Sequence, residues 1–418
     1  MTAPRRVLIV TQFYWPEVGA PQTRYAAVTR VLTRMGVQVD VVTGVPNYPT
    51  GRIHDGYSAW RPTTETHEGV RIHRLPLFAY GGTNKWLRLV NHGSLATTAF
   101  AGALIDLPTD LVIVESPPLP LVLPAATIAR RYSAPLVMYV PDLWPDVPLA
   151  MGALRPGFAA DRLRDLESIC YRLSWRITVT SDGQRETIVA HPDGGAKKVL
   201  MLPNGFDAEV FRPYRPDECA AERARVGPLA DRALFVHAGT LGHVSALDTI
   251  LGAAATLRGD RSIGFVLVGD GPERARLERD ARERSLDNVV FVGAVPPESV
   301  GRYFSLARAS IASQRDLHVY ERVRPAKVLP SLGSGCGVIY AGRGEMAEML
   351  VRERCGVVIP PEDAAAMARA VSELAGDPDR ARALGDRGRT FAVRDYDFGA
   401  LVQHWWAELT EAYAARAA

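Results

Sequence analysis

The sequence of 418 residues predicts an α/β protein with two Rossmann-like domains, each built on a doubly wound parallel sheet. The chain is too long for one ordinary hydrophobic core, so two domains of about 200 residues are expected. Short apolar runs alternate with longer helical patterns along the whole chain, which is typical of parallel sheets. Several runs are continuously apolar, as in strands that helices cover on both faces.

The first half of the chain contains seven candidate strands: "RVLIV", "VQVDVVT", "VRIHRLP", "DLVIVES", "APLVMYV", "RITVTS" and "KVLMLP". Helical patterns lie between them, such as "RYAAVTRVLTRMG", whose apolar residues recur at three and four positions and which stops at Gly36. After a stretch rich in Pro, Gly and charge, six more candidate strands follow: "ALFVHAG", "IGFVLVGDG", "NVVFVGA", "ASIASQ", "GVIYAG" and "CGVVIP".

These patterns predict four regions. Residues 1–205 form the first domain and residues 231–394 the second, and an inter-domain linker of residues 206–230 joins them. Residues 395–418 form a last helix, which carries Trp405 and Trp406 and is expected to pack back across the domain junction.

Composition limits the partners and the compartment. The net charge of +3 and the pI near 8.7 are only mildly basic, so they do not call for nucleic acid and are compatible with an anionic substrate or contact with an anionic membrane. The four cysteines have neither metal-like nor disulfide-framework spacing, which favours a reducing compartment. The first apolar run is too short for a signal peptide and no run is long enough to span a bilayer, so a cytoplasmic protein is expected.

Glycine-rich turns between a strand and a helix are natural anion sites, because backbone N–H groups and a helix N-terminus meet there. The first such turn, "TQFYWPEVGAPQTR", contains Gly19 and is followed by Arg24 one turn into the helix. The second domain opens similarly with "HAGTLGHVSALDTI", which contains Gly239 and Gly242. Gly269 in "VGDGPE" is a weaker signal, since Gly-Asp-Gly-Pro is also a generic turn.

A basic group precedes another glycine-rich turn in "YERVRPAKVLPSLGSGCGVI". Lys327 stands out because the chain has four lysines against forty-five arginines, and Arg322 and Arg324 flank it. Three cations in this position suit a diphosphate leaving group. The alternative interpretation is a solvated charged face.

Acidic residues occur in two further patterns. In "PDLWPD", Asp142 and Asp146 follow an apolar strand and are candidates for acid/base chemistry or for binding sugar hydroxyls; alternatively the segment is a structural turn in which Asp146 caps the next helix. The pattern Asp395-x-Asp397 resembles a metal–diphosphate signature, but it precedes the last helix rather than following a central strand, so no metal site is expected.

The apolar segment 84–107, with basic residues near its start, predicts either a membrane-facing helix or a helix on the domain surface.

Taken together, the motifs resemble those of retaining glycosyltransferases of family 4, which have the GT-B architecture of two facing Rossmann-like domains. Within that family the chain is most similar to the fucosaminyl- and colanic-acid-type branch of surface-polysaccharide synthesis. The resemblance spans nearly the whole chain and rests on "YWPEVGAPQTRYAAV", "VVTGVPNYPTGRIHDGY", "ESPPLPLVLPA", "VPDLWPD", "VTSDGQRETI", "LPNGFD" and "GDGPE".

The resemblance implies that the second domain binds a nucleoside-diphosphate sugar and the first binds the acceptor, without a metal or a redox cofactor. It also implies front-face displacement, in which the leaving diphosphate helps to deprotonate the acceptor hydroxyl. Two family features are replaced here. The Arg and Lys of the diphosphate motif are Thr240 and Ser245, and the two glutamates eight positions apart are Arg322 and Pro330, although Glu321 restores the first glutamate after a one-residue slip.

The expected function is therefore retaining, metal-independent transfer of a hexose or amino-sugar to a glycan, a lipid-linked acceptor or a natural product. The predicted catalytic residues are Asp142, Glu321, Lys327 and Glu345. The residues predicted to hold the donor or complete the cleft are Gly19, Gly239, Thr240, Gly242, Gly269, Arg322, Arg324 and Lys327. Two alternatives stay open: a pseudo-glycosyltransferase that couples an activated cyclitol or unusual sugar to an amine, and a non-catalytic protein that keeps the fold. Peripheral association with the inner face of the cell membrane is a further possibility.

Overall fold

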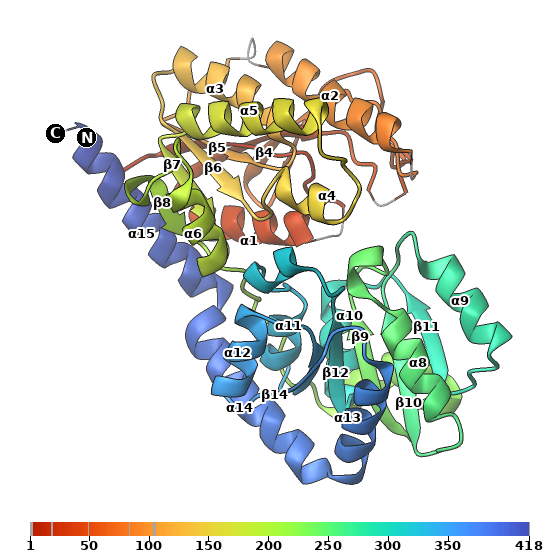
Figure 1. Ribbon diagram of the computed structural model, residues 1–418. Helices are drawn as coiled ribbons and strands as arrows, with labels where there is room; N and C mark the ends of the chain where they lie inside the picture. Colours follow the sequence, from red (N-terminus) through yellow and green to blue (C-terminus); the bar gives the residue numbers. More distant parts are fainter. Residues whose placement is uncertain (1–2, 18–19, 49, 83, 103–105, 418) are drawn as a thin grey trace. The chain divides into compact units, whose positions relative to one another are not determined.

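The computed structural model describes residues 3–17, 20–48, 50–82, 84–102 and 106–417, which form two α/β units (Figure 1). The first unit comprises Met1–Pro203 and Gly399–Ala418, and the second comprises Asn204–Phe398. Each unit contains one sheet with helices on both faces. The predicted class, two Rossmann-like parallel sheets, is confirmed.

The first sheet has the strand order β3-β4-β2-β1-β5-β6-β7-β8. Neighbouring strands are parallel except for the antiparallel pair β3–β4 at one edge. Central strands such as β5 and β6 are buried along their whole length, which is why their sequences are apolar apart from Glu115 at the end of β5. The strands are β1 (Arg6–Val10), β2 (Gln38–Gly44), β3 (Thr63–His67), β4 (Val70–Leu75), β5 (Leu111–Glu115), β6 (Leu136–Val140), β7 (Arg176–Val179) and β8 (Val199–Met201).

Helices of the first unit cover both faces of this sheet (Figure 1). One face packs Leu8, Val112 and Met138 into a core that also contains residues of α2, α3 and α5. The helices are α1 (Ala20–Arg34), α2 (Lys85–Gly102), α3 (Val122–Arg131), α4 (Asp146–Ala150), α5 (Phe158–Leu173), α6 (Asp182–Ala190) and α15 (Phe398–Ala417).

Helix α15 packs on the first unit although it follows the second unit in the chain. The Trp405 side chain is buried, and its indole N–H donates to the Thr178 hydroxyl of β7 at 3.1 Å. Nearby, the rings of Trp175 and Tyr413 meet edge to face with centroids 6.4 Å apart. The last helix is therefore packed against β7 and the residue that precedes it.

The second sheet is parallel throughout, with the strand order β11-β10-β9-β12-β13-β14. The order of the strands reverses between β9 and β12, and ligands of such folds bind at the carboxyl ends of the strands beside this switch point. The strands are β9 (Ala233–Ala238), β10 (Ile263–Val268), β11 (Val289–Gly293), β12 (Ala309–Ser313), β13 (Val338–Ala341) and β14 (Gly356–Ile359).

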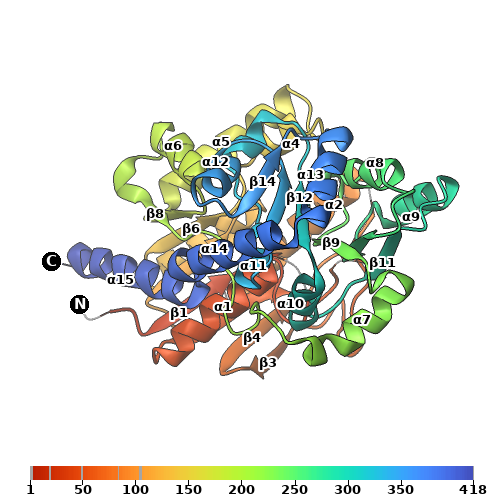
Figure 2. The same ribbon diagram turned by 90° about the horizontal axis from the view of Figure 1, so that it is seen from below.

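Alternate residues of the central strands face the two helical layers. Phe235 and Leu267 join a core with α8 and α13, whereas Val236 joins a core with α7 and α10. Helices α8 and α13 lie side by side (Figure 2) and approach closely at Gly252, where a side chain would crowd α13. The helices are α7 (Ala220–Val226), α8 (Asp248–Thr256), α9 (Arg274–Glu283), α10 (Pro297–Leu306), α11 (Val328–Gly333), α12 (Glu345–Arg352), α13 (Ala364–Gly376) and α14 (Pro378–Tyr396).

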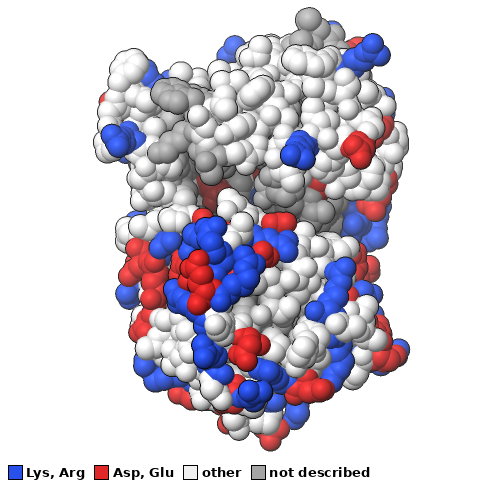
Figure 3. All heavy atoms as spheres, turned by 90° about the vertical axis from the view of Figure 1, so that its right-hand side faces the viewer, with Lys and Arg blue, Asp and Glu red and all other residues white. Residues whose placement is uncertain are grey.

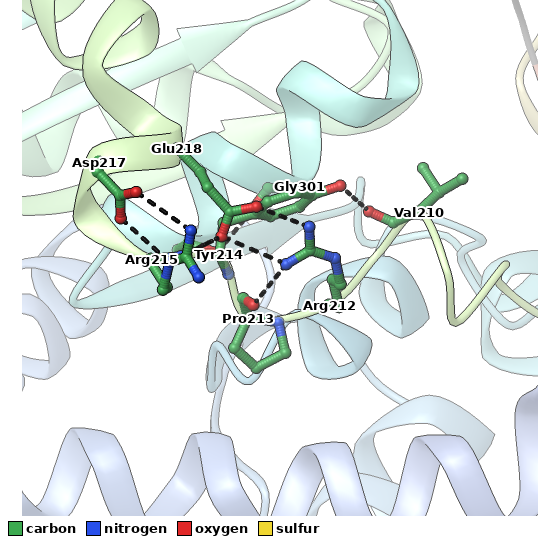
Figure 4. A network of polar contacts seen from close by, with 9 residues as sticks. Val210, Arg212, Pro213, Tyr214, Arg215, Asp217, Glu218 and Gly301 are labelled. Carbon is green, nitrogen blue, oxygen red and sulfur yellow. Dashed lines mark hydrogen bonds and ion pairs between the residues drawn. The ribbon is translucent and has the colours of Figure 1, made fainter.

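Residues 206–230, which the sequence suggests as a linker, are an ordered part of the second unit and contain α7. Their charges pair locally, as Figure 4 shows: Arg212 donates to the Glu218 carboxylate at 2.7 Å and lies 4.0 Å from the ring centroid of Tyr214. The Tyr214 ring packs against α10 at Gly301, where a Cβ would come within 3.0 Å of it. Local pairing explains why a Pro- and charge-rich stretch is not a free connection.

Candidate active site

The turns after β9 and β10 pack backbone against backbone at the switch point of the second sheet. Gly239 and Gly269 have φ angles of +147° and +133°, which L-residues rarely adopt. A Cβ at Gly269 would overlap the carbonyl oxygen of Gly239, and the Leu241 N–H donates to the Asp270 carbonyl at 2.9 Å. Gly269, predicted as a ligand-binding residue, therefore has a structural role, because it lets the two turns meet.

Lys327 reaches the first of these turns from the start of α11. Its ammonium donates to the Ser245 hydroxyl at 2.9 Å, and that hydroxyl donates to the Thr240 carbonyl at 3.3 Å. A Cβ added at Gly239 would lie 3.6 Å from Lys327 Cε, so the lysine stem runs directly over that glycine. The structure thus brings together Lys327 and the turn that contains Gly239, Thr240 and Gly242. Burial lowers the pKa of Lys327 to about 8.

His237 is a residue of this site that the sequence interpretation missed. It lies at the end of β9, fully buried, and its Nδ1–H donates to the Ile311 carbonyl at 3.1 Å. Burial and the neighbouring charge of Lys327 lower its pKa to about 3, so the ring is neutral. Its Nε2 has no hydrogen-bond partner among the described residues. The available signal was a histidine inside the otherwise apolar run "ALFVHAG".

Two other predicted residues pair with each other. The Arg324 Nε–H donates to the Glu345 carboxylate at 2.9 Å, and its Nη1 donates to the Tyr396 hydroxyl at 3.3 Å. Both members of the ion pair are largely buried, and Glu345 is the first residue of α12. Arg324 therefore fixes the Glu345 carboxylate. Arg322, in contrast, is exposed.

Glu321 lies in a short 3-10 turn, η6 (His318–Arg322), beside a small pocket after β12 and β13. Its carboxylate is 3.1 Å from His318 Nδ1. Gly344 packs directly against this turn, because a Cβ at Gly344 would overlap the Glu321 backbone. The φ angle of Gly344 is +74°, which also favours glycine. Pro330, at the position of the second family glutamate, lies inside α11 and offers no side-chain acceptor.

In the first unit, a polar cluster lies at the carboxyl ends of β1, β5 and β6. Glu115 is buried; it accepts a hydrogen bond from the Thr11 hydroxyl at 2.6 Å and lies 3.5 Å from the Arg24 guanidinium, which sits over the Tyr139 ring. Burial raises the pKa of Glu115 to about 7 although Arg24 opposes the shift. The exposed Asp142 adds a second negative charge that acts on Arg24 and Glu115. Glu115 was missed; its signal was an acidic residue ending an apolar strand.

The structure also shows where some of the other residues singled out in the sequence lie. Gly19 lies outside the described residues. Asp146 opens α4 without capping it, because the N-cap is Pro145 and makes no side-chain hydrogen bond, so the capping alternative is wrong. The Asp395 carboxylate binds Arg394 at 2.6 Å. Across the described part of the chain, no group of three His, Cys, Asp or Glu residues is arranged to hold a metal ion.

Two Rossmann-like units with parallel sheets, the first completed by the last helix, define the GT-B class of glycosyltransferase folds. Family comparison agrees with this class: the "Glycosyl transferase 4-like domain" matches residues 19–205, and "Glycosyl transferases group 1" matches residues 232–377. The protein is therefore a glycosyltransferase that contains a family-4-like domain and a group 1 domain.

Relatives and solved structures support the class across most of the chain. The chain is 22% identical over 387 residues to WcaI of Escherichia coli K12, assigned as a glycosyl transferase of colanic acid biosynthesis, covering 88% of this chain and 91% of WcaI. Sucrose-phosphate synthase from Thermosynechococcus elongatus superposes with a TM-score of 0.77 at 18% identity, covering 98% of this chain and 100% of that one. The Anabaena protein HepE in complex with UDP-glucose superposes with a TM-score of 0.71 at 14% identity, covering 97% and 99%.

Proposed function

We propose that this glycosyltransferase moves a hexose or amino-sugar from a nucleoside-diphosphate sugar to a glycan, lipid-linked or natural-product acceptor, with retention and without a metal. The observation that carries the proposal is the Lys327 ammonium, which lies over Gly239 at the switch point of the second sheet. A cation beside a glycine turn suits a diphosphate. HepE, with the same fold, is known in complex with UDP-glucose. The second unit is then the donor domain and the first the acceptor domain.

In the proposed reaction, the bond between the sugar C1 and the diphosphate oxygen breaks, and the acceptor oxygen bonds to C1 on the same face. The acceptor proton passes to an oxygen of the leaving diphosphate. Lys327 stabilises the negative charge that develops on this group. The backbone N–H groups of Thr240 and Gly242 donate to it, because those of Gly239 and Leu241 already donate to the carbonyls of Val268 and Asp270. Because the diphosphate serves as the base, the protein contributes positioning and electrostatic stabilisation.

In this proposal, carboxylates of both units accept hydrogen bonds from hydroxyls of the donor sugar and of the acceptor. Glu345, held by Arg324, accepts hydrogen bonds from donor hydroxyls, with Glu321 in the neighbouring turn. Asp142 binds an acceptor hydroxyl, and Arg24 beside it balances its charge. With Pro330 in place of a carboxylate, the ribose hydroxyls lose a strong acceptor, so the donor is held mainly through its diphosphate and sugar. We place the enzyme in the cytoplasm, at the inner face of the cell membrane.

A panel of nucleoside diphosphates tests the function directly. Titration calorimetry with UDP, GDP, ADP and TDP is expected to show binding of at least one, and the matching sugar donor should be slowly hydrolysed or transferred. Failure to bind any nucleotide contradicts the donor assignment. Turnover of a cyclitol donor with an amine, in place of a sugar donor, selects the pseudo-glycosyltransferase instead. Binding without turnover of any donor selects the non-catalytic alternative.

The pKa of Lys327 predicts a pH dependence of nucleotide binding. The ammonium is protonated below about pH 8 in the free protein, and a bound diphosphate favours this charged form. The affinity for the nucleoside diphosphate is therefore expected to fall as pH rises above about 8, by up to tenfold per pH unit. Calorimetry between about pH 7 and 9.5 measures this, and Lys327→Arg, which stays charged, should remove the decline. A flat profile for the wild type contradicts the role of this lysine.

A further inference from the structure

The small hollow beside η6, after β12 and β13 of the second unit, contains a side-chain amide that the proposed reaction does not use. Gln314 follows directly after β12 and lines this hollow together with Glu321 and Gly342. Gln314 is only 6% exposed. Buried side-chain amides are normally hydrogen-bonded, so the partners of each end of this amide indicate what it does.

The carbonyl end of the amide is fixed by Tyr340. The hydroxyl of Tyr340, a fully buried residue of β13, donates to Gln314 Oε1. Burial raises the pKa of Tyr340, so this hydroxyl keeps its proton and remains a donor. Gly342 allows the contact, because a Cβ there would come within 2.6 Å of the Tyr340 hydroxyl oxygen. The carbonyl end of the amide is therefore directed at Tyr340.

The other end of the amide, Gln314 Nε2, has no hydrogen-bond partner among the described residues. With Oε1 held by Tyr340, the N–H2 group is the polar end that is left to face the hollow. A nearly buried donor without an acceptor is unfavourable, so a ligand that supplies the acceptor gains affinity. Because Tyr340 orients the amide in advance, recognition of such a ligand costs little entropy.

The charged side chains around the hollow are paired with one another. Figure 3 shows many charged residues of both signs on the displayed face of the second unit. Of the charged residues that line the hollow, Arg343 donates to the Asp316 carboxylate at 3.2 Å, and Arg315 donates to that of Glu362 at 2.8 Å. Glu321 adds a further carboxylate to the lining. These charges balance closely, so the hollow favours an uncharged polar group over a phosphate.

The size of the hollow limits what can enter it. Its volume of about 10 Å³ is about the room that one water molecule needs. A single hydroxyl group has this size, whereas a sugar ring or an extended substituent is larger. A hydroxyl also matches the lining chemically, because it can accept from Gln314 Nε2 and donate to the Glu321 carboxylate.

We infer that Gln314 is a specificity-determining residue that binds one hydroxyl of the donor sugar, and that the hollow rejects a larger substituent at the same position of the sugar. This inference rests on the proposed function, in which Glu321 and Glu345 bind donor hydroxyls. Donors that lack this hydroxyl leave the buried amide without an acceptor, and donors with a bulkier group there overfill the hollow.

Titration calorimetry with a deoxygenation series tests the inference. The probes are the glucose donor of whichever nucleoside diphosphate binds (UDP-, GDP-, ADP- or TDP-glucose) and its 2-, 3-, 4- and 6-deoxy analogues. One deoxy analogue is expected to bind the wild type about tenfold or more weakly than the parent donor, and the O-methyl analogue at that position should bind no better. Deoxy analogues that all bind as tightly as the parent donor would overturn the inference.

Two variants assign this selection to the amide. Gln314→Glu keeps an acceptor for the Tyr340 hydroxyl but removes the N–H2 donor, so the penalty of the sensitive deoxy analogue should fall to about twofold or less. Tyr340→Phe frees the amide to rotate and should lower the same penalty. The matched control, Gln403→Glu, makes the same chemical change at an exposed position of α15 and should keep the wild-type penalty. An unchanged penalty in Gln314→Glu contradicts the role of Gln314.

Affinity for the nucleoside diphosphate alone separates this inference from the proposed function. Gln314→Glu should bind the nucleoside diphosphate within about threefold of the wild type, because the amide contacts the sugar and not the diphosphate. An equal loss of affinity for the nucleoside diphosphate and for every donor would be an effect of the added charge, and would overturn the inference. Failure of the wild type to bind any nucleoside diphosphate contradicts the proposed function itself.

Discussion

Replacement of Lys327 by alanine is expected to lower kcat/KM for the sugar donor by about 10² to 10³, the usual effect of losing one strong electrostatic contact to a developing charge. The ammonium is the cation that the structure places against the Gly239 turn, where it bonds only to a neutral hydroxyl, that of Ser245, among the described polar contacts. A diphosphate can therefore bind the ammonium without breaking an ion pair between Lys327 and a carboxylate. Initial-rate kinetics measure the fall in kcat/KM, and calorimetry with the matching nucleoside diphosphate measures the fall in affinity.

The melting temperature of the Lys327→Ala variant distinguishes a role in donor binding from a structural role. Burial lowers the pKa of Lys327, so the charged form is disfavoured in the folded protein and its removal should leave the melting temperature nearly unchanged or slightly higher. Lys197→Ala, at an exposed lysine of the first unit, is the matched control and should keep full activity. A Lys327→Ala enzyme with unaltered donor affinity and turnover would refute the assignment.

The fold was predictable because its signal is local. Strands such as "DLVIVES" and "APLVMYV" are buried on both faces, so their apolar residues alone are enough to predict a buried strand. The 206–230 stretch misled because composition cannot show that Arg212 and Glu218 pair with each other. Likewise no local pattern could show that the last helix contacts Thr178, more than two hundred residues away in sequence.

The site was predictable only where one residue was unusual by itself. Lys327 stands out among arginines, and its position over Gly239 agrees with the expectation that both belong to one site. The pairing of Arg324 with Glu345 was not predictable, because it depends on how η6 and α12 approach. The partnership of Glu115 and Arg24 joins the end of one strand to a helix 91 residues earlier, and no local pattern encodes it.

The largest expected effect on stability is that of Gly269→Ala. A methyl group there would overlap the carbonyl oxygen of Gly239, and alanine would also have to adopt a φ of +133°. Neither problem can be relieved by a side-chain rotation, because both involve backbone. Steric overlap and strain together are expected to cost about 3 kcal/mol or more, which corresponds to a melting temperature roughly 6 to 12 °C lower for a unit of this size.

The same substitution is expected to weaken nucleotide binding, because the added methyl group would push against the Gly239 turn over which Lys327 lies. Gly259→Ala is the matched control: it makes the same chemical change in the same unit, at a site where an added Cβ meets nothing within 4 Å. Scanning calorimetry should therefore show a large shift for Gly269→Ala and almost none for Gly259→Ala. Equal melting temperatures would mean that the two turns do not meet as described. A destabilised Gly269→Ala variant that keeps full nucleotide affinity would separate the packing of the turns from the donor site, and the diphosphate would then have to bind elsewhere than at Gly239.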